Sequence, residues 1–242
     1  MLSDKFLKWI DSRHVDPDAI SRYQRDLRST PTASLCLDNF LQDHQARRIA
    51  EYVMKEAQYK RVFGLFHGKR PIDSQAFVAA EEDNRMFTYE EAEGVAHEFR
   101  MSHNWLSFLR MASLFDTGEF SRYFEILVGR PLSIPKRAIH RHRHDDFLKR
   151  HNDAGDDRAL CAVLYLTPNW QESDGAEFVL APPGQAETRS APSFNRLLVF
   201  RPSSATEHYV APFLPGAYAK ARCCLVFWFN AVDEVLVQRA SI

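Results

Sequence analysis

The sequence predicts an α+β protein in which an N-terminal helical layer packs on a C-terminal β-sandwich. Apolar residues recur at helical spacing over much of residues 1–130, whereas short continuous apolar runs between Pro, Gly and Asn clusters dominate residues 131–242. No Pro-, Gly- or Ser-rich linker separates the two halves. We therefore expect a single domain over 1–242, with residues 1–130 as mainly helical support and residues 131–242 as its core.

Helices and one short strand are expected first. Residues 3–13 and 17–28 have amphipathic patterns, and Asp16-Pro17 is typical of a helix start. A strand is expected over 35–40. A helix from about Asp43 carries an apolar stripe at 3.6-residue spacing, formed by Ala46, Ile49, Ala50, Val53 and Ala57.

The stretch 60–100 shows no clear period. Its acidic runs at 81–83 and 90–93 are interpreted as solvated loop, with a lid over a binding site as the alternative. A helix is expected over 103–115. Next, Asp116 and Glu119 have the spacing of a capping box for a further helix, which ends at Gly129.

The second half predicts strands. Continuous apolar runs with no polar alternation are typical of strands that are buried on both faces. The expected strands are an alternating stretch over 134–144 and continuous apolar runs over 159–166, 197–200 and 223–229.

Composition narrows the class of protein. Apolar residues make up 45% of the chain, and the formal net charge of −1 argues against nucleic acid and anionic membranes as partners. The four cysteines form no C-x-x-C pair and are interpreted as reduced, buried residues. No signal peptide or transmembrane run is present, so we expect a soluble, cytoplasmic protein.

The first candidate for chemistry is the His-x-Asp pair His151 and Asp153. In an extended segment, residues i and i+2 point to the same side, so both side chains can bind one cation. Three alternating histidines stand about 7 Å apart along a strand, too far for all to meet one ion, and one or two are expected to line a cavity: His140, His142 and His144. His208, near the start of another extended segment, is the better third ligand. Two imidazoles and one carboxylate form the facial triad of non-haem Fe(II) oxygenases.

Four segments carry a resemblance to a known family. Residues 146–153 (Asp-Phe-Leu-Lys-Arg-His-Asn-Asp) and 208–212 (His-Tyr-Val-Ala-Pro) resemble two metal motifs. Between them, 164–170 (Leu-Tyr-Leu-Thr-Pro-Asn-Trp) followed by Gly-Ala-Glu at 175–177 is similar to a Tyr-Leu-x-x-x-Trp…Gly-Gly-Glu segment, and 222–228 resembles an Arg-led strand. These motifs, in this order over roughly 130–230, resemble the prolyl 4-hydroxylase-like branch of the Fe(II)/2-oxoglutarate-dependent dioxygenases.

The resemblance implies a double-stranded β-helix core (jelly-roll, cupin-like) with the helical layer on one sheet. It also implies Fe(II), 2-oxoglutarate and O2 as cofactors, with ascorbate as a candidate addition. His151, Asp153 and His208 would be the catalytic metal ligands. Three residues would bind 2-oxoglutarate, namely Arg222 as the cation for the far carboxylate, Tyr165 through its hydroxyl, and His142, for which a structural role is the alternative.

The implied reaction is hydroxylation of an unactivated C–H bond of an amino-acid-like substrate, peptidyl or free, with 2-oxoglutarate converted to succinate and CO2. Related halogenases have a small residue where this chain has Asp153, so the carboxylate favours hydroxylation. Substrate-facing candidates are the segment 74–100 within the N-terminal half and four further residues: Trp170, Glu177, Trp228 and Asn230.

Two alternatives stay open. One is a nucleic-acid oxidative demethylase of the same fold, which the near-neutral charge disfavours. The other is a non-catalytic β-sandwich used for binding or for sugar chemistry. The complete ligand set together with Arg222 disfavours it, because a silent domain has no need of an anion anchor beside a metal.

Overall fold

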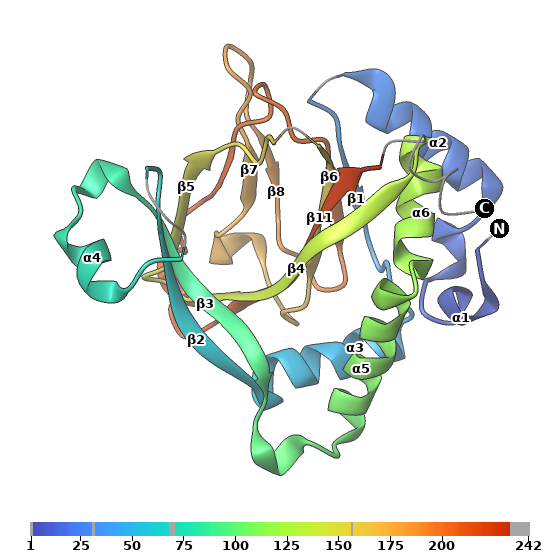
Figure 1. Cartoon of the computed structure of the whole chain (residues 1–242), viewed down its shortest axis with the longest axis horizontal. Helices are drawn as coiled ribbons and strands as arrows, with labels where there is room; N and C mark the ends of the chain where they lie inside the picture. The colour runs from blue at the N-terminus through green and yellow to red at the C-terminus, as the bar shows by residue number, and fades with distance from the viewer. Residues whose placement is uncertain (1, 31, 68–70, 156, 233–242) are drawn as a thin grey trace.

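The strands form an almost closed antiparallel barrel. A computed structural model describes residues 2–30, 32–67, 71–155 and 157–232 (Figure 1). Within these ranges eleven strands follow the order β1-β9-β6-β11-β4-β3-β5-β10-β7-β8, with β2 paired to β3. Their bounds are β1 Ser34–Leu37, β2 Ala57–Leu65, β3 Arg85–Val95, β4 Leu132–His142, β5 Phe147–His151, β6 Arg158–Tyr165, β7 Phe178–Leu180, β8 Thr188–Ser190, β9 Leu197–Phe200, β10 His208–Val210 and β11 Arg222–Ala231.

The barrel is a jelly roll made of two facing sheets. One contains β1, β9, β6, β11 and β4, the other contains β5, β10, β7 and β8, and β3 joins them by pairing with both β4 and β5. The outermost strands β1 and β8 also approach each other, since Cys36 Sγ lies 3.5 Å from Ser190 Oγ. The two sheets therefore enclose an interior, and a predicted jelly-roll core is confirmed.

Strand β6 explains the continuous apolar runs. Its even-numbered residues Leu160, Ala162 and Leu164 pack against the helical layer, whereas Cys161, Val163 and Tyr165 face the barrel interior. Because successive side chains in a strand point to opposite faces, a strand covered on both sides must be apolar at every position. The same holds for β9 and β11.

A helical layer covers the outer face of the first sheet. Its helices are α1 Asp4–Leu7, α2 Pro17–Ser29, α3 Asp43–Glu51, α5 His103–Asp116 and α6 Glu119–Val128, whereas α4 Ser74–Ala79 lies apart from this layer beside β2. Phe115 of α5 stacks on Phe227 of β11 with ring centroids 4.7 Å apart, and Phe124 of α6 contacts Phe229 at 4.5 Å. Each such buried ring contributes about 2–3 kcal/mol. None of the helices in the described ranges is both long and apolar enough to cross a membrane.

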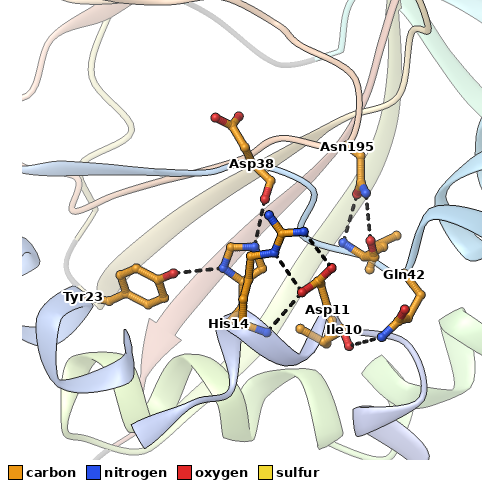
Figure 2. A network of polar contacts seen from close by, with 9 residues as sticks. Ile10, Asp11, His14, Tyr23, Asp38, Gln42 and Asn195 are labelled. Carbon is orange, nitrogen blue, oxygen red and sulfur yellow. Dashed lines mark hydrogen bonds and ion pairs between the residues drawn. The ribbon is translucent and has the colours of Figure 1, made fainter. Parts of the chain in front are cut away.

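The N-terminal segment corrects the helix expected over 3–13. Only Asp4–Leu7 is α-helical, because the backbone at Trp9 and Asp11 instead hydrogen-bonds to the segment 40–42. A polar network then fixes this segment to the barrel (Figure 2). In it, the buried His14 contacts the Tyr23 hydroxyl at 3.0 Å and the Asp38 carbonyl oxygen at 2.9 Å.

The long hairpin of β2 and β3 corrects the reading of 90–93 as solvated loop. Figure 1 shows this hairpin beside β4, with α4 in the connection between its strands. Glu90 forms ion pairs with Arg141 at 2.6 Å and Arg143 at 3.2 Å. Cations on neighbouring strands thus neutralise the acidic run and allow it to form a strand. Ala57, placed on the α3 stripe by its spacing, begins β2.

Two other boundaries differ from expectation. The first strand ends at Leu37, before Asn39 with a φ of 53°. Asp116 is the last residue of α5 and does not cap α6, which instead follows Gly118 with a φ of 76°. Gly129 ends α6 with a φ of 77°, a left-handed conformation that glycine adopts without strain. The short loop between α5 and α6 requires a left-handed backbone conformation, which Gly118 provides and a capping box does not.

Candidate metal centre

His151, Asp153 and His208 meet inside the barrel. His151 ends β5 and His208 begins β10, and these two residues are direct partners in the antiparallel ladder. Asp153 follows β5 by two residues. One ligand atom from each of the three lies within 4.8 Å of the others. Asp153 Oδ1 is 3.6 Å from His151 Nε2, and its Oδ2 is 3.7 Å from His208 Nε2.

Backbone contacts orient both imidazoles. His151 Nδ1 lies 2.9 Å from the Lys149 carbonyl oxygen, and His208 Nδ1 lies 3.1 Å from that of Thr206. A carbonyl oxygen only accepts, so each Nδ1 must carry the proton and donate. Each Nε2 then keeps a free lone pair directed toward Asp153. This is the usual outer contact of a metal-ligating histidine.

The charge states of the ligands also suit a cation. Burial, reinforced by His151, lowers the pKa of His208 to about 4, so this imidazole is neutral at pH 7. Burial alone would raise the pKa of Asp153. The two histidines and the Trp228 indole outweigh it and hold the pKa below its usual value. The neutral His208, the His151 imidazole and the Asp153 carboxylate therefore face each other, a donor set that fits a ferrous ion.

The three ligands line a cavity of about 480 Å³. Its walls include alternate residues of the neighbouring strands β11 and β4. Those of β11 are Arg222, Cys224, Val226 and Trp228, and those of β4 include His140 and His142. The cavity is large enough for small organic ligands.

Arg222 is a buried cation in this cavity. It is 3% exposed, and its Nε has no hydrogen-bond partner. Within the described part of the chain, no carboxylate forms an ion pair with it; its guanidinium is 3.5 Å from the Tyr165 hydroxyl. Burial raises the pKa of Tyr165, which keeps that hydroxyl protonated and able to donate. A buried unpaired charge is strongly unfavourable, so this place fits an anion such as the far carboxylate of 2-oxoglutarate.

The three alternating histidines divide between the cavity and the surface. His142 pairs across the strands with Arg222, stacks on Tyr89 at 5.0 Å, and has an unpartnered Nδ1. His140 also lines the cavity, and burial lowers its pKa to about 3. His144 lies beyond the end of β4 and is exposed. His142 is thus close to Arg222.

Of the four single residues expected to face substrate, only Trp228 lines the cavity. Trp170 packs on Phe213 in a separate cluster and donates to the Gly175 carbonyl oxygen at 3.1 Å. Glu177 points toward Arg189 at 3.8 Å. Asn230 accepts a hydrogen bond from Arg158 at 3.1 Å and is not among the residues that line the cavity. The structure therefore does not bring these three residues to the cavity, and their contact with substrate stays a prediction.

Other lining residues were not named from the sequence. The expected segment 74–100 does reach the cavity, through Met86, Phe87, Tyr89 and Glu91 of β3. Lys136, Arg158 and Cys161 also line it. For Lys136 a signal existed, because it has the same parity along β4 as His140 and His142. No sequence signal identified the β3 residues, because their position in the cavity depends on the pairing of β3 with β4 and β5.

A known family model matches the part of the chain that contains this site. Residues 137–230 match the family model described as the 2OG-Fe(II) oxygenase superfamily. These residues contain all three candidate metal ligands and Arg222. A comparison with curated protein sequences finds no match.

Several solved structures share the fold. A prolyl hydroxylase from Trichoplax adhaerens, solved in complex with a peptide fragment of the hypoxia inducible factor oxygen degradation domain, aligns with a TM-score of 0.60 and 18% identity over 89% of this chain and 94% of that one. A 2OG-Fe(II) oxygenase family oxidoreductase from Burkholderia pseudomallei gives 0.61 and 19% over 89% and 92%. A prolyl-4-hydroxylase from Pseudomonas putida gives 0.53 and 17% over 88% and 100%.

Proposed function

Because residues 137–230 carry a 2OG-Fe(II) oxygenase domain, we propose that the protein hydroxylates an unactivated C–H bond of an amino-acid-like substrate. The substrate is a prolyl or other residue of a peptide, or a free amino acid or similar small molecule. The peptide-bound prolyl hydroxylase of similar fold supports the peptidyl form.

In this proposal His151, Asp153 and His208 hold Fe(II), and Arg222 binds the far carboxylate of 2-oxoglutarate. When bound, iron and 2-oxoglutarate supply the oxidising chemistry, in which O2 delivers one oxygen atom to the substrate and the other to succinate as CO2 is released. The single observation that carries the proposal is the buried, unpaired guanidinium of Arg222 in the same cavity as the triad.

The other lining groups bind, orient and exclude water. The Tyr165 hydroxyl is placed to donate to the same carboxylate as Arg222, and His142 offers a further polar nitrogen beside them. Val163 and Val226 give the cavity an apolar wall, which strengthens the ionic contact by lowering the local dielectric. Trp228 orients Asp153 by donating to its Oδ2 at 3.0 Å.

A non-catalytic sandwich accounts for this cavity less well. Such a domain would carry the unfavourable burial of Arg222 without a ligand that relieves it. The observed groups favour neither nucleic acid nor sugar as substrate.

The first test is anaerobic binding of Fe(II) and 2-oxoglutarate. A ferrous ion chelated by a keto acid gives a visible metal-to-ligand charge-transfer band, and we expect the band with the wild-type protein. His151→Ala should abolish it. His144→Ala is the matched control, because this exposed histidine lies outside the cavity, and the band should persist.

The second test is turnover. Succinate release from 2-oxoglutarate, measured across a panel of free amino acids and peptides, should rise above the basal level with the true substrate class. A protein that binds Fe(II) and 2-oxoglutarate yet yields no succinate with any panel member would contradict hydroxylation of this class.

A further inference from the structure

Two lining cations, Lys136 and Arg158, are not used by the metal or cosubstrate sites proposed above. They lie on the strands to either side of β11, since Lys136 pairs with Trp228 in β4 and Arg158 pairs with Asn230 in β6. Lys136 Nζ is 5.1 Å from the centroid of the Trp228 ring. Positive charges from both neighbouring strands therefore border the strand whose indole contacts Asp153.

These two cations differ from the others nearby. No carboxylate lies within ion-pair distance of Lys136 or Arg158 in the described ranges, and Arg158 Nε donates only to the neutral amide oxygen of Asn230. Neighbouring cations on β2 and β4 are all paired, as Lys60 with Glu93 at 2.8 Å, Arg137 with Asp116 at 2.7 Å, and both Arg141 and Arg143 with Glu90.

An acidic residue lies one strand further along the same sheet, since β3 pairs with β4 and Glu91 is the ladder partner of His140. Glu91 of β3 lines the cavity, and its Oε2 is 3.9 Å from His140 Nε2, too far for a hydrogen bond. That Nε2 is buried and has no hydrogen-bond partner. A neutral polar group without a partner, on the strand that carries Lys136 and beside Glu91, points to a polar ligand that completes it.

We propose that Lys136 and Arg158 form a receptor for a carboxylate of the substrate, with Trp228 as the surface between them. Lys136 is exposed whereas Arg222 is buried, so this receptor lies nearer to solvent than the proposed 2-oxoglutarate subsite. The inference rests on the proposed function and narrows its substrate to molecules that carry a carboxylate. The carboxylate comes either from the main chain of a free amino acid or from an acidic side chain of a peptide.

A variant at Glu91 can distinguish a free amino acid from an acidic peptide side chain as the source of the carboxylate. A free amino acid also carries an ammonium group, which Glu91 on the neighbouring strand β3 would attract, whereas an acidic peptide side chain has no such group. The Glu91→Gln variant should therefore weaken binding of a free amino acid and leave binding of an N-acetylated acid unchanged.

The experiment is calorimetric titration of three probes into protein loaded with Mn(II) and 2-oxoglutarate. The probes are N-acetyl-glutamate amide, its uncharged counterpart N-acetyl-glutamine amide, and free glutamine. We expect at least one carboxylate probe to bind about three- to tenfold more tightly than the uncharged probe, because two partly exposed ion pairs contribute about this much. High salt screens such pairs, so the difference in affinity should become smaller as salt is added.

Variants locate the effect. Lys136→Gln and Arg158→Gln should each reduce the preference for the carboxylate, and Lys136→Arg should retain it. Lys55→Gln is the matched control, because Lys55 is an exposed cation on the helical side that pairs with Glu51 and does not line the cavity. The control should leave the preference unchanged.

Two results overturn the receptor. One is that the carboxylate probes bind no more tightly than the uncharged probe. The other is that tighter binding of the carboxylate probe is unchanged in both Lys136→Gln and Arg158→Gln. Failure of the proposed function looks different, because it appears as loss of the charge-transfer band or of succinate release. The receptor at Lys136 and Arg158 is tested only by the affinities of the charged and uncharged probes, which require no turnover.

Discussion

The indole nitrogen of Trp228 lies 3.0 Å from Oδ2 of Asp153 and donates a hydrogen bond to it. Trp228 lies on β11, and Asp153 follows β5, which belongs to the opposite sheet. One hydrogen bond thus ties a candidate metal ligand to a strand across the barrel. Groups that orient a ligating carboxylate commonly change metal affinity when they are removed.

Replacement of Trp228 by Phe should therefore weaken metal binding by about tenfold. The variant keeps an aromatic ring but loses the N–H donor to Asp153. Titration calorimetry with Mn(II) measures the change. Trp170→Phe is the control, since its indole donates to Gly175 outside the cavity. Equal Mn(II) affinities in the wild type and the Trp228 variant would rule out the positioning role.

Replacement of Arg222 by Gln should separate cosubstrate binding from metal binding. Loss of one partner of a buried charge pair is worth about 2–5 kcal/mol, so 2-oxoglutarate affinity should fall at least about 30-fold. The metal ligands stay in place, so Mn(II) affinity should be nearly unchanged. The ligand-free variant should be at least as stable as the wild type in chemical denaturation, because an unpaired buried charge is removed.

The control for that change is Arg141→Gln, which removes a paired arginine at a neighbouring strand position. It should leave 2-oxoglutarate affinity unaltered and lower stability through loss of the Glu90 contact. If the Arg222 variant still binds 2-oxoglutarate as the wild type does, the carboxylate must be bound elsewhere in the cavity.

Local patterns were enough to predict much of the core and part of the site. Side-chain alternation places His151 and Asp153 on one side of an extended segment, and it places the apolar β6 between two covered faces. Both depend only on the geometry of a single strand. Helix α6 ends at Gly129 for an equally local reason.

Features set by pairing between distant segments could not be predicted in this way. Glu90 belongs to a strand because Arg141 lies opposite, 51 residues later. Asn230 accepts a hydrogen bond from Arg158, 72 residues earlier, and does not line the cavity. Trp170 is drawn into a separate cluster by Phe213, from a loop that follows β10. None of these partners can be identified from the spacing within one segment.

His140 should make stability depend on pH. Burial lowers its pKa from the ordinary value of 6.5 to about 3 in the folded protein. Between these values the unfolded chain binds a proton that the folded chain does not, so the contribution is fully present above about pH 6.5 and is lost as pH falls. The slope from this one group is about 1.4 kcal/mol per pH unit.

His140→Gln removes that titration while keeping a polar side chain. In urea unfolding between pH 7 and pH 4.5, the wild type should lose more free energy of unfolding than the variant as pH falls, because only the wild type has this titration. His144→Gln, at an exposed position, should follow the wild-type slope. Parallel curves for the wild type and His140→Gln would show that His140 does not titrate differently on unfolding.

The Gly175-Ala176 pair yields the last prediction, because both residues have positive φ, 73° and 53°. A Cβ at Gly175 would lie 2.5 Å from the backbone oxygen of Pro212, so Gly175→Ala must displace the main chain and should destabilise by about 2 kcal/mol or more. At Ala176, Gly would relieve about 1 kcal/mol of left-handed strain but lose one buried methyl of about 0.8 kcal/mol. Ala176→Gly should therefore be nearly neutral in thermal unfolding. A large loss of stability in that variant would mean that packing of the methyl beside Trp170 outweighs the backbone strain.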